Sequence, residues 1–146
     1  MAMDRPCKNK HLLPVVRLPL LLKFSFIPAR AGFPSPADDY LEGKLDINRL
    51  LIQHPNSTYI FRVEGDSMVS ERICNDDLLI IDTSITPKSG EIILAVLDGG
   101  FVVKRMIQRD NHILLMAMDG DFDPILVKPE RDFEIWGKVT FAIHRY

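Results

Sequence analysis

The sequence is poor in cysteine, with only Cys7 and Cys74 in 146 residues. The two lie far apart, and no C-x-x-C pair occurs. Disulfide-stabilised domains and zinc ribbons need more cysteines at closer spacing. We therefore expect two free thiols in a reducing compartment, the cytoplasm, with no disulfide, no metal site and no cofactor.

A large excess of charge of one sign is also lacking. The 18 Lys and Arg residues against 20 Asp and Glu residues give a net charge of −2. Proteins that bind DNA directly usually carry a basic face, so direct binding to nucleic acid is not expected. The composition, 47% hydrophobic and 26% charged, is typical of one globular domain with a sizeable core.

No hydrophobic run is long enough for a transmembrane helix, which needs about 20 predominantly apolar residues. The most apolar stretch, residues 12–28, is interrupted by Arg17 and Lys23 and by three prolines. Prolines prevent a regular helix. We interpret residues 1–31 as an extended arm, suited to lie along a groove or a sheet edge as a peptide substrate does.

An alternative for the same stretch is a secretory signal, because Ala29-Arg30-Ala31 before Gly32 has the A-x-A form of a signal cleavage site. The charges leave two apolar runs of five residues each. A signal peptide needs an uninterrupted run of about 7–15 residues, so this alternative is disfavoured.

From Thr58 onward the sequence predicts a mainly β fold. Six short apolar or alternating runs separated by turn residues fit within about 90 residues, which indicates a compact, strongly bent sheet. One or two short helices are expected before them, the first from Pro36 to just before Gly43 and the second capped by Asp46. The second helix is expected over Ile47–Gln53, and the strands over Thr58–Val63, Leu78–Ile81, Glu91–Leu97, Phe101–Ile107, His112–Met118 and Phe133–Ile143.

Ser67 lies in a Gly65-Asp66-Ser67-Met68 turn between apolar segments, where a nucleophile can be presented. Gly65 allows the chain to turn sharply, and the successive backbone N–H groups of Asp66 and Ser67 are candidates for an oxyanion hole. Taken alone, such a turn is common and carries no chemistry. Met68 is expected in the core.

Lys104 is a candidate base for Ser67. Strand alternation places it on one face with Val102 and Met106, and places Arg105 on the other face with Phe101. One of the two cations must therefore face apolar surroundings. If that cation is Lys104, loss of solvation lowers its pKa, and a neutral lysine can activate a serine.

Two other patterns in the sequence suggest different chemistry, and both are disfavoured. Asp119, Asp121, Asp123 and Glu130 have the spacing of a calcium loop, but Pro124 stands where such a loop requires glycine. A Ser-His-Asp triad is disfavoured because no G-x-S-x-G motif ties a histidine to the serine. The four histidines are His11, His54, His112 and His144.

Five stretches of the chain carry a family resemblance, and they occur in unbroken order over residues 31–146. These stretches are Ala31–Pro36, Gly65–Met68, Asp77–Asp82, Phe101–Arg105 and Ile135–Val139. Together they closely resemble the LexA/UmuD family of self-cleaving Ser/Lys peptidases. Residues 1–30 match only loosely. The segment Val69–Asp77 departs from the pattern, because relatives commonly have glycines there; Asn75 tolerates a left-handed backbone nearly as well.

The resemblance implies a serine endopeptidase of the SOS response that cuts its own Ala31–Gly32 bond with Ser67 and Lys104. It implies that residues 1–31 form an arm removed by cleavage, and that residues 32–146 form a β-rich peptidase and dimerisation domain. The activator it implies is a filament of RecA on single-stranded DNA. The shortened form would be a homodimer serving a UmuC-type translesion polymerase.

The alternative function is a non-enzymatic, dimeric interaction module that regulates a DNA polymerase and uses the arm only as an anchor. A LexA-like repressor is disfavoured, because the 31 residues before the expected cut contain four prolines. They are too few for a helix-turn-helix domain and a linker.

Overall fold

The computed structural model describes residues 13–14, 21–25, 42–117 and 122–146, and every structural statement below refers to these residues. The chain divides into two compact units. The larger comprises Met1–Val15 and His54–Tyr146, and the smaller comprises Val16–Gln53. Each unit is described by itself.

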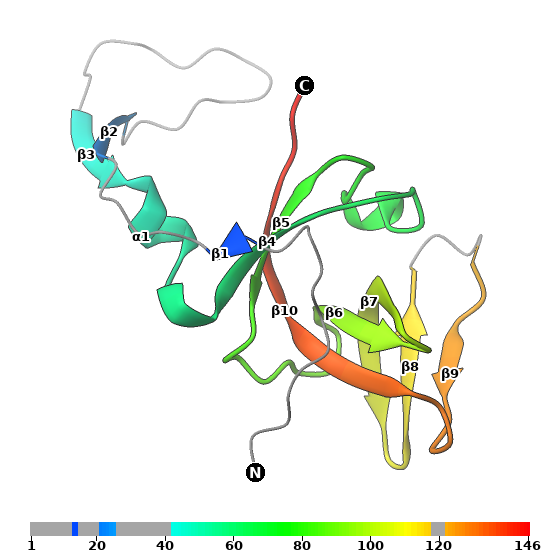
Figure 1. Ribbon diagram of the computed structural model, residues 1–146. Helices are drawn as coiled ribbons and strands as arrows, with labels where there is room; N and C mark the ends of the chain where they lie inside the picture. Colours follow the sequence, from blue (N-terminus) through cyan, green and yellow to red (C-terminus); the bar gives the residue numbers. More distant parts are fainter. Residues whose placement is uncertain (1–12, 15–20, 26–41, 118–121) are drawn as a thin grey trace. The chain divides into compact units, whose positions relative to one another are not determined.

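The larger unit is built on one eight-stranded antiparallel sheet (Figure 1). Two short 3-10 turns, Pro55–Ser57 and Val69–Glu71, lie in its connections. Neighbouring strands in the sheet follow the order β1-β4-β5-β10-β6-β7-β8-β9. Their bounds are β1 Leu13–Pro14, β4 Thr58–Arg62, β5 Leu78–Asp82, β10 Phe133–Ile143, β6 Ile92–Leu97, β7 Gly100–Arg109, β8 His112–Met116 and β9 Ile125–Val127.

The long strand β10 joins the two halves of this sheet. Its first half, from Phe133 to Lys138, pairs with β6, and its second half, from Lys138 to Ile143, pairs with β5. The register shifts once between Ile135 and Gly137 and again between Val139 and Phe141. Bulges of this kind bend a strand and increase its twist, so β10 accounts for the bent sheet that the sequence predicts.

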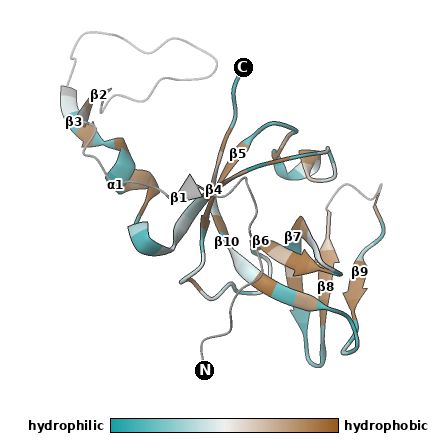
Figure 2. Cartoon of the chain, in the orientation of Figure 1, coloured by the Kyte–Doolittle hydropathy of each residue, from teal (hydrophilic) through white to brown (hydrophobic). Residues whose placement is uncertain are grey.

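The core lies on both faces of β6. Leu94 belongs to one apolar cluster, which includes Met68, Leu79 and Ile81, whereas Ile93 and Ala95 belong to a second cluster with further apolar residues of the sheet. A strand covered on both faces is expected to be continuously apolar rather than alternating. The β6 sequence IILAVL has this property, and Figure 2 shows the strand as hydrophobic.

The described part of the smaller unit contains a two-stranded sheet and one helix. β2, Leu21–Ser25, pairs antiparallel with β3, Glu42–Asp46, and α1 spans Ile47–Leu51. The Asp46 side chain caps α1 by accepting hydrogen bonds from the N–H groups of Asn48 and Arg49, at 3.1 and 3.3 Å. An aspartate there satisfies N–H groups that have no partner within the helix.

The sequence predicted this secondary structure in large part. The mainly β class and all six expected strands are confirmed, most bounds within about two residues, and β10 has the predicted bounds. The helix capped by Asp46 is confirmed but ends at Leu51 rather than at Gln53. The helix predicted from Pro36 is wrong at its end, because residue 42 belongs to β3, and the rest of it lies outside the described residues. β3 and β9 were not predicted, and neither were β1 and β2, since residues 1–31 were expected to form only an extended arm.

No helix in the described part of the chain is both long and apolar enough to cross a membrane.

Gly137 of β10 leaves no room for a side chain. A Cβ atom there would lie 2.7 Å from Ile81 Cγ2 and 3.0 Å from the Asp82 carbonyl oxygen. We expect Gly137→Ala to destabilise the protein by about 1–3 kcal/mol through overpacking, and to lower Tm by several degrees in a thermal melt followed by circular dichroism. Gly100→Ala is the matched control, because its nearest atom would be 3.7 Å away. Equal Tm values for the two variants would contradict this packing.

Candidate active site

Ser67 lies in the connection between β4 and β5, on a turn that hydrogen bonds hold in shape. Gly65 has φ +92°, in the left-handed region that favours glycine. Its N–H donates to Asn75 Oδ1 at 2.8 Å, and the Val69 N–H donates to the Asp66 carbonyl at 3.2 Å. Met68 is 2% exposed, so it anchors the turn in the core as the sequence predicted.

The base of this connection is closed by two backbone hydrogen bonds, from the Val63 N–H to the Asp77 carbonyl and from the Asp76 N–H to the Val63 carbonyl, both 2.9 Å. Besides Gly65, the residues with left-handed backbone in the connection are Arg72 and Asp76, at φ 60° and 69°. Asn75, which we expected to take that conformation, instead accepts the Gly65 N–H through its side chain. The connection therefore contains two non-glycine residues with left-handed backbone and is held by a side-chain hydrogen bond from the Gly65 N–H to Asn75.

Lys104 lies in the middle of β7, opposite Ile93 of β6. Its Nζ is 3.0 Å from Ser67 Oγ, within hydrogen-bonding distance, and it also lies over the ring of Phe122, 5.3 Å from the ring centroid. Both Ser67 and Lys104 are half-buried. The structure thus brings together the two residues that the sequence singled out.

A groove of about 500 Å³ opens beside this pair. The β4 side contributes residues 61–65, and β7 contributes Phe101 and Val103 beside Lys104. Leu94 and Met68 complete its apolar lining. The groove therefore combines largely apolar walls with polar groups at Ser67 and Lys104, a combination found in ligand-binding sites.

An ion pair ties the Ser67 segment to β7. The Arg105 guanidinium donates to both carboxylate oxygens of Glu71, from Nε to Oε1 at 2.6 Å and from Nη2 to Oε2, and it also donates to the Gly90 carbonyl. The side chains are 26% and 10% exposed, respectively. The hydrogen bonds from Arg105 to Glu71 raise the pKa of Arg105 despite its burial. Sequence reasoning missed this pair, because nothing in the spacing of 34 residues indicates it.

The two faces of β7 agree with the predicted alternation. Met106 is buried in one apolar cluster with Val102 beside it, and Phe101 and Val103 pack against the other. The charge of Arg105 is paired with the carboxylate of Glu71, and the Lys104 side chain extends to Ser67.

The remaining candidates do not join the Ser67 site. His54 Nδ1 lies 2.6 Å from Asp82 Oδ2, and His144 Nδ1 lies 2.6 Å from Asp77 Oδ1. His112 is exposed at the start of β8. Several predictions lie outside the described residues: the Ala31–Gly32 bond, His11, and Asp119 and Asp121 of the acidic loop.

Comparison with known proteins gives a family match that spans both Ser67 and Lys104. Residues 25–140 match the model of the family described as peptidase S24-like. The chain is 40% identical to Protein MucA of Salmonella typhimurium over 77% of each chain, and 38% identical to Protein ImpA of Escherichia coli over 80% of this chain and 79% of that one. It is 34% identical to LexA repressor 1 of Geobacter sulfurreducens, over 76% of this chain and 55% of the repressor.

The Glu71–Arg105 pair should contribute measurably to stability. Glu71→Gln leaves a largely buried guanidinium without its counter-charge, so we expect a loss of about 2–3 kcal/mol in urea denaturation. A double-mutant cycle with Arg105→Gln should give a coupling energy of about 1–3 kcal/mol.

The control is Arg62→Gln. Arg62 Nη1 lies 3.7 Å from Asp76 Oδ1, and both side chains are mostly exposed. That change should alter stability by less than about 0.5 kcal/mol. Strict additivity of Glu71→Gln and Arg105→Gln would show that the two side chains do not interact.

Proposed function

Because the chain belongs to the peptidase S24-like family, as the resemblance to the LexA/UmuD family indicated, we propose that it is a serine endopeptidase that cleaves itself. Ser67 is the nucleophile and Lys104 is its base. The observation that carries this proposal is the 3.0 Å separation of Lys104 Nζ and Ser67 Oγ at the side of an apolar groove. A nucleophile and a base within hydrogen-bonding reach are the minimum requirement for such chemistry.

The reaction proceeds in two stages on these groups. The neutral amine of Lys104 accepts the hydroxyl proton as Ser67 Oγ bonds to the carbonyl carbon of Ala31. The ammonium then gives a proton to the nitrogen of Gly32 as the peptide bond breaks. Water, deprotonated by the same amine, hydrolyses the acyl ester and restores the serine.

The Ser67 turn has a second role in this proposal. Negative charge develops on the Ala31 carbonyl oxygen during attack, and the backbone N–H groups of Asp66 and Ser67 are assigned to stabilise it. The Gly65–Asn75 hydrogen bond fixes the turn that carries both groups. Fixed donors are effective because they need no reorganisation during the reaction.

The biological setting is proposed from the family resemblance. Cleavage removes residues 1–31 and is stimulated by RecA on single-stranded DNA in the cytoplasm during the SOS response. The shortened chain, residues 32–146, acts as a homodimer with a UmuC-type translesion polymerase. The chain itself makes no direct contact with nucleic acid, as its net charge of −2 favours.

Mutation of the pair tests the chemistry. Ser67→Ala and Lys104→Ala should each abolish self-cleavage, and the double variant should be no worse, because the two groups act as one unit. Lys104→Arg should fail as well, since a guanidinium stays protonated. Intact-mass measurement should find residues 32–146 as the product of the wild-type chain.

Ser70→Ala and Lys128→Ala are matched controls at exposed positions and should cleave normally. Substantial cleavage by purified Lys104→Arg protein would refute Lys104 as the base. A product that still forms from Ser67→Ala protein would indicate an outside protease.

The pH profile distinguishes a peptidase from a passive interaction module. A lysine acts as a base only when neutral, and an ordinary lysine has a pKa of about 10.4. Purified wild-type protein without any partner should therefore cleave slowly at pH 7 and faster as pH rises toward about 10. A histidine base would level off near about pH 6.5–7.

Circular dichroism at each pH must show that the protein remains folded. A folded chain that yields no product anywhere between pH 7 and 10 would exclude the peptidase and leave the non-enzymatic module.

A further inference from the structure

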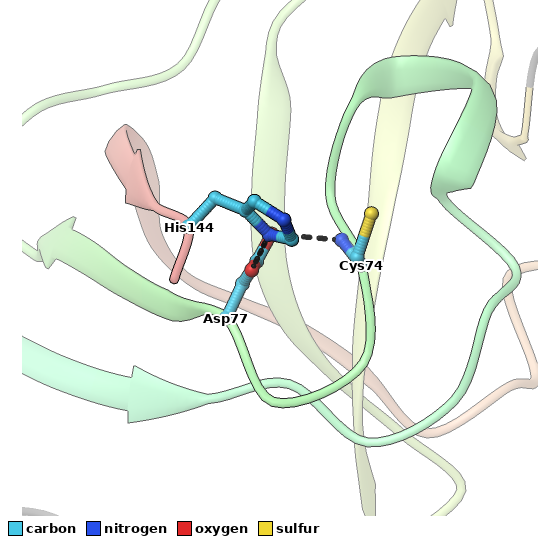
Figure 3. A group of neighbouring side chains, drawn as sticks. All are labelled: Cys74, Asp77 and His144. Atoms are coloured by element: carbon cyan, nitrogen blue, oxygen red, sulfur yellow. Dashed lines mark hydrogen bonds and ion pairs between the residues drawn. The ribbon is translucent and has the colours of Figure 1, made fainter. Parts of the chain in front are cut away.

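Three side chains of metal-ligand type gather where the end of β10 meets the turn before β5 (Figure 3). They are Cys74, Asp77 and His144, and one ligand atom from each lies within 4.8 Å of the others. Strand register explains the meeting. Leu78 of β5 pairs with Ile143 of β10, so Asp77 and His144 lie next to each other just beyond that pair.

Asp77 is a fixed carboxylate at the bottom of this cluster. Its side chain is 1% exposed. Oδ2 accepts the Cys74 N–H at 2.8 Å, and Oδ1 lies 2.6 Å from His144 Nδ1. The hydrogen bond from Cys74 lowers the pKa of Asp77 and, together with His144, outweighs the burial that would raise it.

The other two side chains are accessible from solvent. His144 is 44% exposed, and Cys74 is half-buried with a free thiol. The cluster thus combines a buried carboxylate with a partly exposed imidazole and a half-buried cysteine.

We propose that Cys74, Asp77 and His144 bind a divalent transition-metal ion of the zinc class. Thiolate, imidazole and carboxylate are the ligands that Zn²⁺ takes in proteins, whereas Mg²⁺ and Ca²⁺ prefer oxygen ligands. The ligands are Cys74 Sγ, one ring nitrogen of His144 and a carboxylate oxygen of Asp77, with water in the fourth position.

Metal binding requires the side chains to adjust in both directions: the 2.6 Å contact between His144 Nδ1 and Asp77 Oδ1 must lengthen, and the wider separations must close. Ligand atoms around a tetrahedral Zn²⁺ lie about 3.3–3.8 Å apart, given bond lengths of about 2.0–2.3 Å. In the proposed site, rotation of the Cys74 and His144 side chains brings the separations of up to 4.8 Å into this range. Coordination by the thiolate releases the thiol proton to solvent, so binding should weaken as the pH falls.

The competing interpretation is structural. In it, the hydrogen bond between His144 Nδ1 and Asp77 Oδ1 holds the segment after β10 against the turn, and the thiol lies nearby without a role. That interpretation predicts that His144 affects stability but that the protein has no metal affinity. A direct binding measurement therefore distinguishes the two interpretations.

The test uses the full-length, reduced, metal-free chain and Co²⁺ as the probe. Cobalt bound to a thiolate gives a charge-transfer absorption in the near ultraviolet, and we expect it to saturate at one ion per chain and to disappear when Zn²⁺ is added. Cys7→Ser is the matched control, since Cys7 and Cys74 are the two cysteines of the sequence. It should keep the absorption, and Cys74→Ser should lose it.

His144→Gln should weaken Zn²⁺ binding at least tenfold in calorimetry, because it removes one of three protein ligands. Cys74→Ser retains the backbone N–H that Asp77 accepts, so this variant should fold, as circular dichroism can verify. Absence of the thiolate–cobalt absorption in folded wild-type protein would overturn the proposal. So would an absorption that persists in Cys74→Ser and is lost in Cys7→Ser.

Discussion

The site depends on the pairing of β10 with two different strands. Its second half pairs with β5, which follows the Ser67 connection, and its first half pairs with β6, which pairs in turn with the strand of Lys104. The two residues come from opposite halves of the sheet, and β10 is the common neighbour that sets their separation. A slip of one residue in a strand turns its side chains to the other face, so the two bulges of β10 must be held in place. At the first bulge, Gly137 lies so close to Ile81 and Asp82 that there is no room for a side chain.

The adjacent cations Lys104 and Arg105 have different roles because their head groups differ. The planar guanidinium of Arg105 fits the carboxylate of Glu71 with two parallel hydrogen bonds and remains charged. The compact amine of Lys104 extends to Ser67. Since Glu71 follows Ser67 by four residues, the Arg105 pair holds the serine segment against the strand that carries Lys104. The approach of the two reactive atoms is thus supported by an ion pair one residue away in β7.

Features that depend on neighbouring residues could be predicted from the sequence. Contacts between residues far apart in the sequence could not. The six strands and the Asp46 cap follow from hydrophobic runs, turn residues and capping chemistry, each contained within a few neighbouring residues. β3 was missed because Gly43 and Lys44 favour strands poorly, and pairing with β2 decides its conformation. β9 is only three residues long, too short to show a period. The Asn75–Gly65 hydrogen bond and the meeting of Cys74 with His144 depend on the folded loop and on strand register, which no local pattern contains.

Trp136, the single tryptophan of the sequence, packs against two other aromatic rings. The Trp136 ring centroid lies 4.9 Å from that of Tyr59 and 5.8 Å from that of Phe101, with an edge-on contact to Phe101, which in turn lies 5.2 Å from Phe61. Phe61 and Phe101 are both walls of the groove beside Ser67. Indole emission responds to the polarity and packing around the ring. The chain therefore has an intrinsic fluorophore, one aromatic contact away from the groove, that can report occupancy of the groove without any attached dye.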